Sequence, residues 1–404
     1  MKVVVTGQVG LDKAAFIRGV ISIATAEGHQ VVACNVGEMM YAEAPDVAPG
    51  RILDMSLGRL TSLRRSVFKD ILRTCGSGPH LIVNTHATFR WKHGLFYAFD
   101  YDQMKQLDAD LYVSIVDNID RVHYRLRRDG HADHTLKDLM VWREEEILAT
   151  ELLAQIVRGH GRFFICSRGT DSQPDAAGSS NPDAPWFDAS QPACQSPSAG
   201  LARMAMPGAA ALARLMLHPD MKKAYLSYPM SHLSQEVAPE ALADIGVFRR
   251  EMKRHFICFD PGDVDEKELC GPALKAAEEG RRTMEFGPPG ELAVLDTSQV
   301  LDIIPDIDGQ IYARDFKLID QSDMIVSFVP ELDGGRPGLS SGVERELQHA
   351  HEATKDVYLI WRPAAAPSPF VTETATRVFR SVQEAIAFFV NERILPRPTG
   401  SLFA

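Results

Sequence analysis

The 404-residue chain is predicted to be an α/β protein with two open parallel-sheet domains. Two observations carry this prediction: short β-branched runs alternate with helical stretches over residues 1–166, and a second alternation of the same kind begins near Lys223. Between these two regions the composition changes abruptly at Ser167. We therefore expect a first domain at 1–166, a linker with a short helix at 167–221, and a second domain at 222–404.

The first domain is expected to contain a parallel sheet with helices on both faces. Its strands correspond to short apolar runs at 2–6, 30–35, 81–84, 111–116 and 162–166. A helix at about 13–27 follows the first strand, and helical segments separate the later strands. Because polar residues follow several of these runs, polar side chains should collect at the carboxyl edge of the sheet.

The region between the domains differs from both. From Ser167 to about Gly200 it is rich in Ser, Pro, Gly, Asp and Ala. Such a composition cannot bury enough apolar surface to order itself, so we expect a linker or exposed loop. A short helical stretch at 209–217 precedes the second domain.

The second domain is expected to repeat the strand–helix alternation. Strands are predicted at 223–229, 256–259, 324–329 and 357–361, and helices at 239–255, 342–353 and 381–392. In this arrangement Asp315 and Glu346 would each lie at the end of a strand.

Composition and charge exclude some classes of protein. Hydrophobic residues make up 45% of the chain and charged residues 24%, a profile typical of a soluble globular protein. The net charge is −11, from 43 Lys and Arg against 54 Asp and Glu, whereas a general nucleic-acid binder normally has a basic surface. We expect no nucleic-acid partner.

Cysteine spacing and hydropathy indicate the compartment. The six cysteines contain no CxxC pair, so neither a metal site nor a disulfide framework is expected, and a reducing compartment is favoured. No apolar run approaches the roughly 18 residues of a membrane span, and the chain opens directly into a strand rather than a signal peptide. These features predict a cytoplasmic protein with no membrane partner.

Two carboxylates in the second half are the strongest candidates for catalysis. Asp315 follows Arg314, and Glu346 lies near the start of a predicted helix, after a Gly/Pro-rich loop at 333–338. Small or hydroxyl-bearing residues open that helix, where they would offer amides and hydroxyls to a phosphate: Ser340, Ser341 and Gly342. Paired carboxylates at such a place suit acid/base or nucleophilic work on a phosphate-bearing or sugar substrate. The alternative for Glu346 is an ordinary solvated helix acid.

The N-terminal strand is followed by a loop where a phosphate-binding loop belongs. In the pattern G-x-x-x-x-G-K-[ST], the loop amides and Lys hold phosphates and the hydroxyl holds magnesium. Gly7 and Lys13 fit this pattern, and Gly10 also lies in the loop. Asp12 stands in place of the second glycine, and Ala14 lacks the hydroxyl. A plain strand–turn–helix explains the segment equally well.

Further segments of the first half resemble, in order, those of the archaeal-type adenylate kinases. They are Cys34–Met40, the run Asn84-Thr85-His86-Ala87-Thr88, His93-Gly94 and the arginine-rich stretch 121–129. The resemblance covers about 1–166 and implies a P-loop kinase-like fold. It adds His86, Arg125 and Arg128 to the candidate nucleotide-binding residues.

The kinase chemistry of this first half is expected to be weak. The family usually has Asp at the position of Asn84, and an amide is a poorer magnesium ligand than a carboxylate. Asp12, Ala14 and Asn84 therefore all weaken magnesium-assisted phosphoryl transfer. We expect a nucleotide-binding or scaffold domain, with Mg²⁺ and ATP required only if this domain is active.

The second half resembles the nucleoside 2-deoxyribosyltransferase superfamily, which includes the 2′-deoxynucleoside 5′-phosphate N-hydrolases. Three segments carry the resemblance over about 222–363: Tyr225–Ser231, Arg314–Asp323 and Ser340–Ala350. It implies a flavodoxin- or Rossmann-like fold. By this resemblance Glu346 is the nucleophile that attacks C1′ of the sugar, and Asp315 assists departure of the base as a proton donor.

The same resemblance implies a set of substrate-binding residues and a class of substrate. The set is Tyr228, Pro229, Ser231, Arg314, Ser340, Ser341 and Gly342. The expected partner is a nucleotide or nucleoside; no metal or cofactor is required for the glycosidic chemistry, and a homo-oligomer is expected. Gln348 and Tyr228 stand where the family often has glycine, which leaves the identity of the substrate open.

Other functions stay open at this point. A nucleotide sensor would bind its ligand in either half without turnover. An active adenylate or nucleoside monophosphate kinase would transfer phosphate from ATP with magnesium. The glycosidic reaction is favoured because both carboxylates occur within an ordered set of three motifs.

Overall fold

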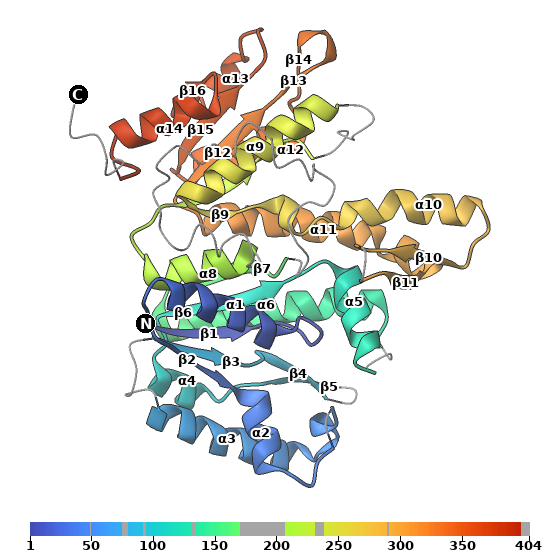
Figure 1. Ribbon diagram of the computed structural model, residues 1–404. Coiled ribbons are helices and arrows are strands. Elements are labelled where there is room, and N and C mark those ends of the chain that lie inside the picture. The colour runs from blue at the N-terminus through green and yellow to red at the C-terminus, as the bar shows by residue number, and fades with distance from the viewer. Residues whose placement is uncertain are drawn as a thin grey trace. The chain divides into compact units, whose positions relative to one another are not determined.

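The computed structural model describes residues 1–48, 50–74, 80–91, 94–130, 134–169, 207–230, 238–288 and 291–396 (Figure 1). By their contacts these residues divide into two compact units. The first unit takes the described parts of 1–171, 205–217 and 264–311, and the second takes those of 218–263 and 312–396. Most of the predicted linker, 170–206, lies outside the described residues.

A five-stranded parallel sheet forms the centre of the first unit. Its order is β2-β3-β1-β6-β7, with bounds Val31–Asn35, His80–Asn84, Lys2–Thr6, Leu111–Val116 and Phe163–Ser167. Val3, Val4 and Val5 of the central strand are fully buried, as expected for a parallel strand covered on both faces. The prediction of a parallel α/β sheet is confirmed here.

Helices of the first unit surround this sheet. They are α1 (Lys13–Ala26), α2 (Val36–Glu43), α3 (Leu57–Thr74), α4 (Tyr101–Leu107), α5 (Ile119–Arg128), α6 (Leu136–Arg158) and α8 (Pro207–Leu217). A hairpin of β4 (Thr88–Trp91) and β5 (Gly94–Tyr97), which the sequence did not predict, follows β3. Helix α8 packs against α1.

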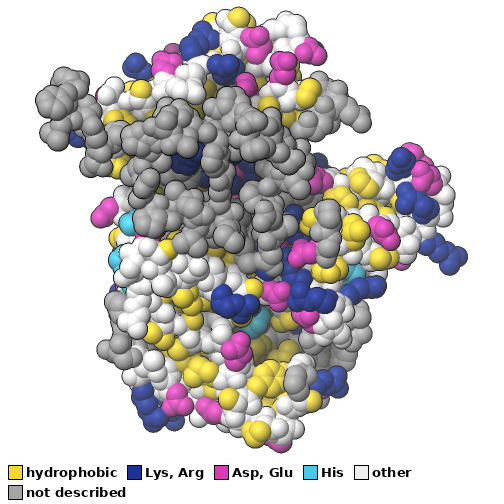
Figure 2. Space-filling model, in the orientation of Figure 1, with side chains coloured by type: hydrophobic (Ala, Val, Ile, Leu, Met, Phe, Trp, Pro, Cys, Tyr) yellow, Lys and Arg dark blue, Asp and Glu magenta, His cyan; other side chains and the backbone are white. Residues whose placement is uncertain are grey.

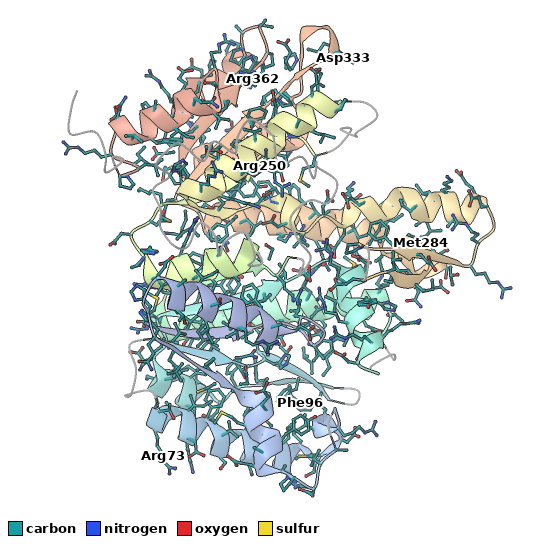
Figure 3. All side chains as sticks on the ribbon, viewed as in Figure 1. Arg73, Phe96, Arg250, Met284, Asp333 and Arg362 are labelled. Carbon is teal, nitrogen blue, oxygen red and sulfur yellow. The ribbon has the colours of Figure 1, made fainter. Side chains whose placement is uncertain are left out.

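Residues 264–311 group with the first unit, although the sequence division assigned all of 222–404 to one domain. They contain α10 (Cys270–Glu278), the hairpin of β10 (Thr283–Phe286) and β11 (Ala293–Asp296), and the start of α11 (Thr297–Asp320). Strand β11 packs against α5, and Met284 of β10, labelled in Figure 3, is buried.

The second unit contains a parallel sheet of order β16-β15-β12-β8-β9. The bounds are Arg377–Phe379, Asp356–Trp361, Met324–Val329, Lys223–Ser227 and Ile257–Phe259. If these five strands are numbered 1 to 5 in chain order and the sheet is read from β9, the order is 2-1-3-4-5, which is the flavodoxin-like arrangement. The predicted fold class is therefore confirmed for this unit.

The helices that accompany this sheet are α9 (Pro239–His255), α12 (Ser341–Glu352), α13 (Pro369–Thr372) and α14 (Val382–Asn391). A short hairpin of β13 (Glu331–Leu332) and β14 (Arg336–Pro337) precedes α12. Aromatic rings fill the core: Phe248 of α9 stacks on Phe328 of β12 at 5.3 Å, and Phe256 meets Phe389 of α14 edge to face at 5.3 Å.

The prediction that the two carboxylates end strands is wrong. Asp315 lies inside α11 and Glu346 inside α12, so both project from helices. Helix α11 was missed in the sequence because Pro305 and Gly309 interrupt its pattern.

The surface and the helices add two observations. On the face shown in Figure 2, Lys and Arg side chains lie beside Asp and Glu. None of the helices within the described ranges combines the length and apolar character that a membrane span requires.

Candidate functional site

Glu346 is held at the carboxyl edge of the second sheet by two residues of β8. The Tyr225 hydroxyl donates to Glu346 Oε1 at 2.8 Å, and the Ser227 hydroxyl donates to Oε2 at 2.6 Å. Tyr225 and Ser227 are two residues apart, so they point to the same face of the strand. Both carboxylate oxygens therefore have a fixed hydrogen-bond donor.

The place of this carboxylate follows from the strand order. In a flavodoxin-like sheet, ligands bind outside the carboxyl ends of the strands where the order reverses, here between β8 and β12. Ser227 is the last residue of β8, and Ser327 of β12 donates to its hydroxyl at 3.4 Å. Glu346 thus lies at the position where this topology places a ligand site.

Helix α12 aims Glu346 at the strands. Its N-cap is Ser340, whose hydroxyl accepts from the Val343 amide at 3.3 Å. Val343, Leu347 and Ala350 are buried against the sheet, and Glu346 lies on the border of this apolar face. The structure places Ser341 and Gly342 exposed in the first turn.

The environment of Glu346 changes its acidity. Burial, together with the nearby charge of Asp315, raises the pKa of Glu346 to about 8. The bonds from Ser227 and Tyr225 act in the opposite direction because they favour the ionised form. Below about pH 8, Glu346 of the free protein therefore carries a proton.

Asp315 approaches Glu346 from α11. It is half-buried, and the neighbouring Arg314 is buried. Edge-to-face contacts of Phe316 with Tyr312 at 4.6 Å and with His349 at 4.5 Å pack this end of α11 against α12. The structure brings Asp315 and Glu346 together, as the sequence predicted, although from helices.

Tyr228 does not join this pair. It follows Ser227, so its ring lies on the other side of the sheet and packs against Phe248. Its hydroxyl donates to buried Asp260 at 2.6 Å, and Asp260 also pairs with Arg249 at 2.7 Å. The side chain of Tyr228 therefore supports the fold at this edge. Pro229 follows in the loop, and Ser231 lies outside the described residues.

The sequence reasoning missed two residues of the site. Tyr225 and Ser227 lie within the segment Tyr225–Ser231, but neither is among the predicted site residues. Their spacing of two before the end of a strand was a usable signal, because alternate residues share one face of a sheet.

In the first unit, the phosphate-loop lysine is turned inward. The Lys13 ammonium donates to the Gly7 carbonyl at 2.7 Å and lies 3.3 Å from His86 Nε2. Burial lowers the pKa of Lys13 to about 8, against the opposing effect of Glu146. Gly7 and Gly10 have positive φ angles, and a Cβ on Gly10 would lie 2.8 Å from Leu126.

His86 is anchored by a buried acid that the sequence did not single out. Its Nδ1 lies 3.3 Å from Glu146 Oε1, and the Ala87 amide donates to Glu146 Oε2 at 2.8 Å. Burial, followed by the charge of Lys13, lowers the pKa of His86. Glu146 is 60 residues from His86 in sequence, so no local pattern could pair them.

The two candidate arginines have different surroundings. Arg125 is fully buried, pairs with Asp117 and donates to the Gly10 carbonyl at 3.0 Å. It thus braces the loop, and its guanidinium is not exposed to a phosphate. Arg128 is half-exposed and pairs with Asp12 at 3.1 Å, which offsets the negative charge in the loop.

The residues of the first unit do not fit a magnesium ion. Ala14 has no hydroxyl, and the Asn84 amide donates to Asn35 Oδ1 at 2.9 Å. Across the described residues, no group of three or more His, Cys, Asp or Glu side chains is arranged to hold a metal.

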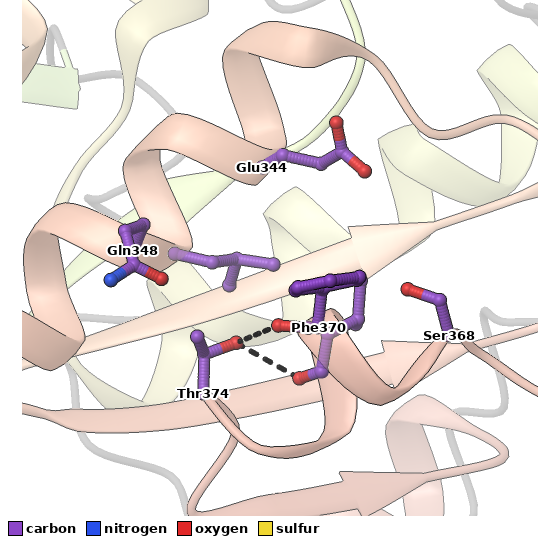
Figure 4. A pocket seen from close by; sticks show the side chains of 7 residues that line it. Glu344, Gln348, Ser368, Phe370 and Thr374 are labelled. Carbon is purple, nitrogen blue, oxygen red and sulfur yellow. Dashed lines mark hydrogen bonds between the residues drawn. The ribbon is translucent and has the colours of Figure 1, made fainter.

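A small pocket of about 290 Å³ lies between α12 and α13 (Figure 4). Glu344 and Gln348 line it together with Phe370, and the Thr374 hydroxyl donates to the Phe370 and Val371 carbonyls at 3.2 and 2.9 Å. Because Glu344 and Gln348 share one face of α12, Glu346 lies on the opposite face. The pocket is therefore separate from the carboxylate site.

Comparisons with known proteins assign no family. No protein-family model matches the sequence, and no curated protein matches it significantly. Among solved structures, a gluconokinase from Sinorhizobium meliloti 1021 aligns with 53% of this chain and 94% of its own, at 16% identity and a TM-score of 0.27. A TM-score of this size assigns no fold, so the architecture rests on the strand order and register described above.

Proposed function

We propose that the second unit cleaves the N-glycosidic bond of a nucleotide or nucleoside, with Glu346 as nucleophile and Asp315 as proton donor. The observation that carries the proposal is the Glu346 carboxylate, bound by Tyr225 and Ser227 at the reversal of strand order and paired with Asp315. The motif resemblance described from the sequence supports the same assignment.

The reaction requires two carboxyl groups in different protonation states. Ionised Glu346 attacks C1′ of the sugar, the C1′–N bond breaks, and its electron pair leaves with the base, which takes a proton from Asp315. Water then attacks C1′ of the glycosyl ester, gives a proton to Asp315 and releases Glu346 as a carboxylate. The products are the free base and the sugar or sugar phosphate. A second base in place of water gives exchange.

The protonation of Glu346 sets a condition for this chemistry. Its nucleophilic form is the carboxylate, whereas a pKa of about 8 leaves it protonated in the free protein at neutral pH. The charge of Asp315 contributes to this raised pKa, so the one proton of the pair rests on Glu346 in the free protein. This proton must pass to Asp315 once substrate is bound, which leaves Glu346 ionised for attack and Asp315 able to protonate the base. The Tyr225 and Ser227 hydroxyls then stabilise the ionised form once the proton has left.

A panel of ribo- and deoxyribonucleosides and their 5′-phosphates tests this proposal. Mass spectrometry before and after incubation should show a free base and the matching sugar product from at least one of them. Addition of a second base distinguishes hydrolysis from exchange. Absence of base release from every compound would reject the proposal.

For the first unit we propose nucleotide binding without phosphoryl transfer. The poor fit to magnesium supports this, since Ala14 and Asn84 supply neither a hydroxyl nor a carboxylate. A coupled assay with ATP, AMP and Mg²⁺ should detect no ADP. ADP formation that is lost in Lys13→Ala would favour the kinase instead.

A further inference from the structure

Strand β12 of the second unit carries one polar side chain in an otherwise apolar run. All six of its residues, Met324–Val329, are buried, and Ser327 is the one among them with a polar side chain. Ile325 and Val329, which alternate with it on the same face of the strand, are fully buried and apolar. A buried hydroxyl costs free energy unless it makes a hydrogen bond. Apolar packing alone therefore does not explain a serine at this position.

Ser327 meets a second buried serine on the neighbouring strand β8. The two strands are parallel, and their register places Ser327 opposite Ser227. Both residues are fully buried, and the Ser327 hydroxyl donates to Ser227 Oγ at 3.4 Å. This distance is longer than the roughly 2.7–2.8 Å of most bonds between hydroxyls, so the bond is weak. Its main effect is on the orientation of the Ser227 hydroxyl.

The direction of this bond follows from a count of hydrogens. A serine hydroxyl has one hydrogen and two acceptor sites. Ser227 gives its hydrogen to Glu346 Oε2 at 2.6 Å, so toward Ser327 it can only accept. The two serines and Glu346 thus form a chain in which each hydroxyl donates toward the carboxylate. If Ser227 instead turned its hydrogen to Ser327, Glu346 Oε2 would lose this donor.

The serine chain acts on the carboxylate oxygen that Tyr225 does not hold. Tyr225 donates to Oε1 at 2.8 Å, and Asp315 of α11 acts on Glu346 through its charge. These two titratable residues and Ser227 are the neighbours that change the pKa of Glu346. A hydroxyl that accepts a hydrogen bond becomes a stronger donor, because the bonds of a chain polarise one another in a low-dielectric interior. Ser327 therefore strengthens the bond from Ser227 to the ionised carboxylate.

We propose that Ser327 is a positioning residue for the reaction: it fixes the Ser227 hydroxyl in the orientation that donates to Glu346, and so stabilises the carboxylate that attacks the substrate. The inference rests on the proposed function of the second unit. In that mechanism the proton of Glu346 passes to Asp315 when substrate is bound. Without the Ser327 hydroxyl, Ser227 is a weaker and less well oriented donor, so Glu346 keeps its proton in a larger share of the bound complexes. The loss should thus appear in kcat rather than in KM.

A direct titration of Glu346 tests this role without any turnover. In the full-length protein, labelled with ¹³C at the side-chain carboxyl carbon of glutamate, the NMR signal that disappears in Glu346→Gln belongs to this residue. Ser327→Ala should raise the pKa of Glu346 by roughly 0.3–0.5 unit, a smaller shift than Ser227→Ala causes. Ile325→Val, which shortens an apolar side chain on the same face of β12, is the control and should leave this titration unchanged.

A double variant shows whether Ser327 acts through Ser227. Because its effect depends on the Ser227 hydroxyl, Ser327→Ala should cause no further shift in a Ser227→Ala background. Ser327→Cys, whose thiol is a weaker donor, should shift the pKa of Glu346 in the same direction and gives the measurement if Ser327→Ala does not fold. An unchanged titration in the Ser327 variants, or an equal shift by Ser327→Ala with and without the Ser227 hydroxyl, would overturn the proposal.

Turnover separates this inference from the proposed function. With a substrate from the panel, Ser327→Ala should lower kcat by roughly two- to fivefold with little change in KM, and should move the loss of activity at alkaline pH to higher pH. If no compound releases base, the proposed function fails, and the titration still decides whether Ser327 positions Ser227. Base release by Ser327→Ala with the kcat and pH profile of the wild type would reject the positioning role and leave the proposed function intact.

Discussion

At the scale of single residues, the proposed catalysis depends on the proton of Glu346. Its raised pKa means that the native state holds this proton more tightly than the unfolded chain does. The associated stability is fully present below about pH 4.5 and is lost as the pH rises through about 8. Enzymes commonly have residues with perturbed pKa values in their active sites, and these residues lower the stability of the folded protein.

Glu346→Gln should therefore stabilise the protein at alkaline pH. Gln cannot ionise, so the variant avoids the cost of burying a charge beside Asp315. We expect its free energy of unfolding to exceed that of the wild type by about 1–3 kcal/mol at pH 9, with a smaller difference at pH 5. Denaturant unfolding at the two pH values measures this, and equal differences at both would contradict the raised pKa.

The pH dependence of base release should report the same group. Since the pair must keep one proton for Asp315 to give to the base, kcat/KM should fall as the pH rises through about 8, where that proton is lost. Ser227→Ala removes a bond that lowers the pKa of Glu346, so the falling limb should move to higher pH by about 0.5–1 unit, with a lower plateau. A profile that stays in place in the variant would show that Ser227 does not act on Glu346.

At the scale of elements, the carboxyl edge of the second sheet is braced by a tight turn. A Cβ on Gly262 would lie 2.2 Å from the Tyr228 hydroxyl, which donates to Asp260. Gly262→Ala should thus separate Tyr228 from Asp260 and destabilise the protein by about 1–3 kcal/mol. Thermal unfolding measures this. Gly271→Ala in α10, where the new Cβ meets open space, is the control and should change stability by less than about 1 kcal/mol.

The sequence predicted these elements where their patterns were regular. Helix α9 has the predicted bounds, 239–255, and the parallel strands other than β16, which was not predicted, were found within a few residues. Helix α11 was missed because Pro305 and Gly309 normally end helices, and packing overrides them here. In the site, Glu346 and Asp315 were predicted from motifs. The partners Glu146 and Glu266 could not be, because they meet residues 60 and 123 positions away.

At the scale of the whole molecule, the chain does not divide into two consecutive halves. Residues 264–311 group with the first unit, where buried Glu266 accepts two bonds from Arg143 and one from the Ile119 amide at 2.9 Å. Removing one partner of a buried ion pair leaves an uncompensated charge and typically costs about 3–5 kcal/mol. The first unit should therefore require this later segment.

Glu266→Gln tests that dependence in the full chain. The variant keeps an acceptor but removes the charge opposite Arg143, so we expect a loss of about 2–4 kcal/mol in stability. Lys267→Gln is the matched control, because Lys267 forms an exposed pair with Asp308 that is worth less than about 1 kcal/mol. Similar melting temperatures for the two variants would show that the buried pair does not hold the segment in place.

The most direct test of the central claim is the rate of base release by three proteins on one substrate from the panel: wild type, Glu346→Gln and Glu344→Gln. Glu344 is exposed and lies on the opposite face of α12, so its variant should stay within about twofold of the wild type. Glu346→Gln should lose roughly a thousandfold or more in kcat/KM, because it removes the nucleophile. A Glu346→Gln variant that releases base at the wild-type rate would contradict the account.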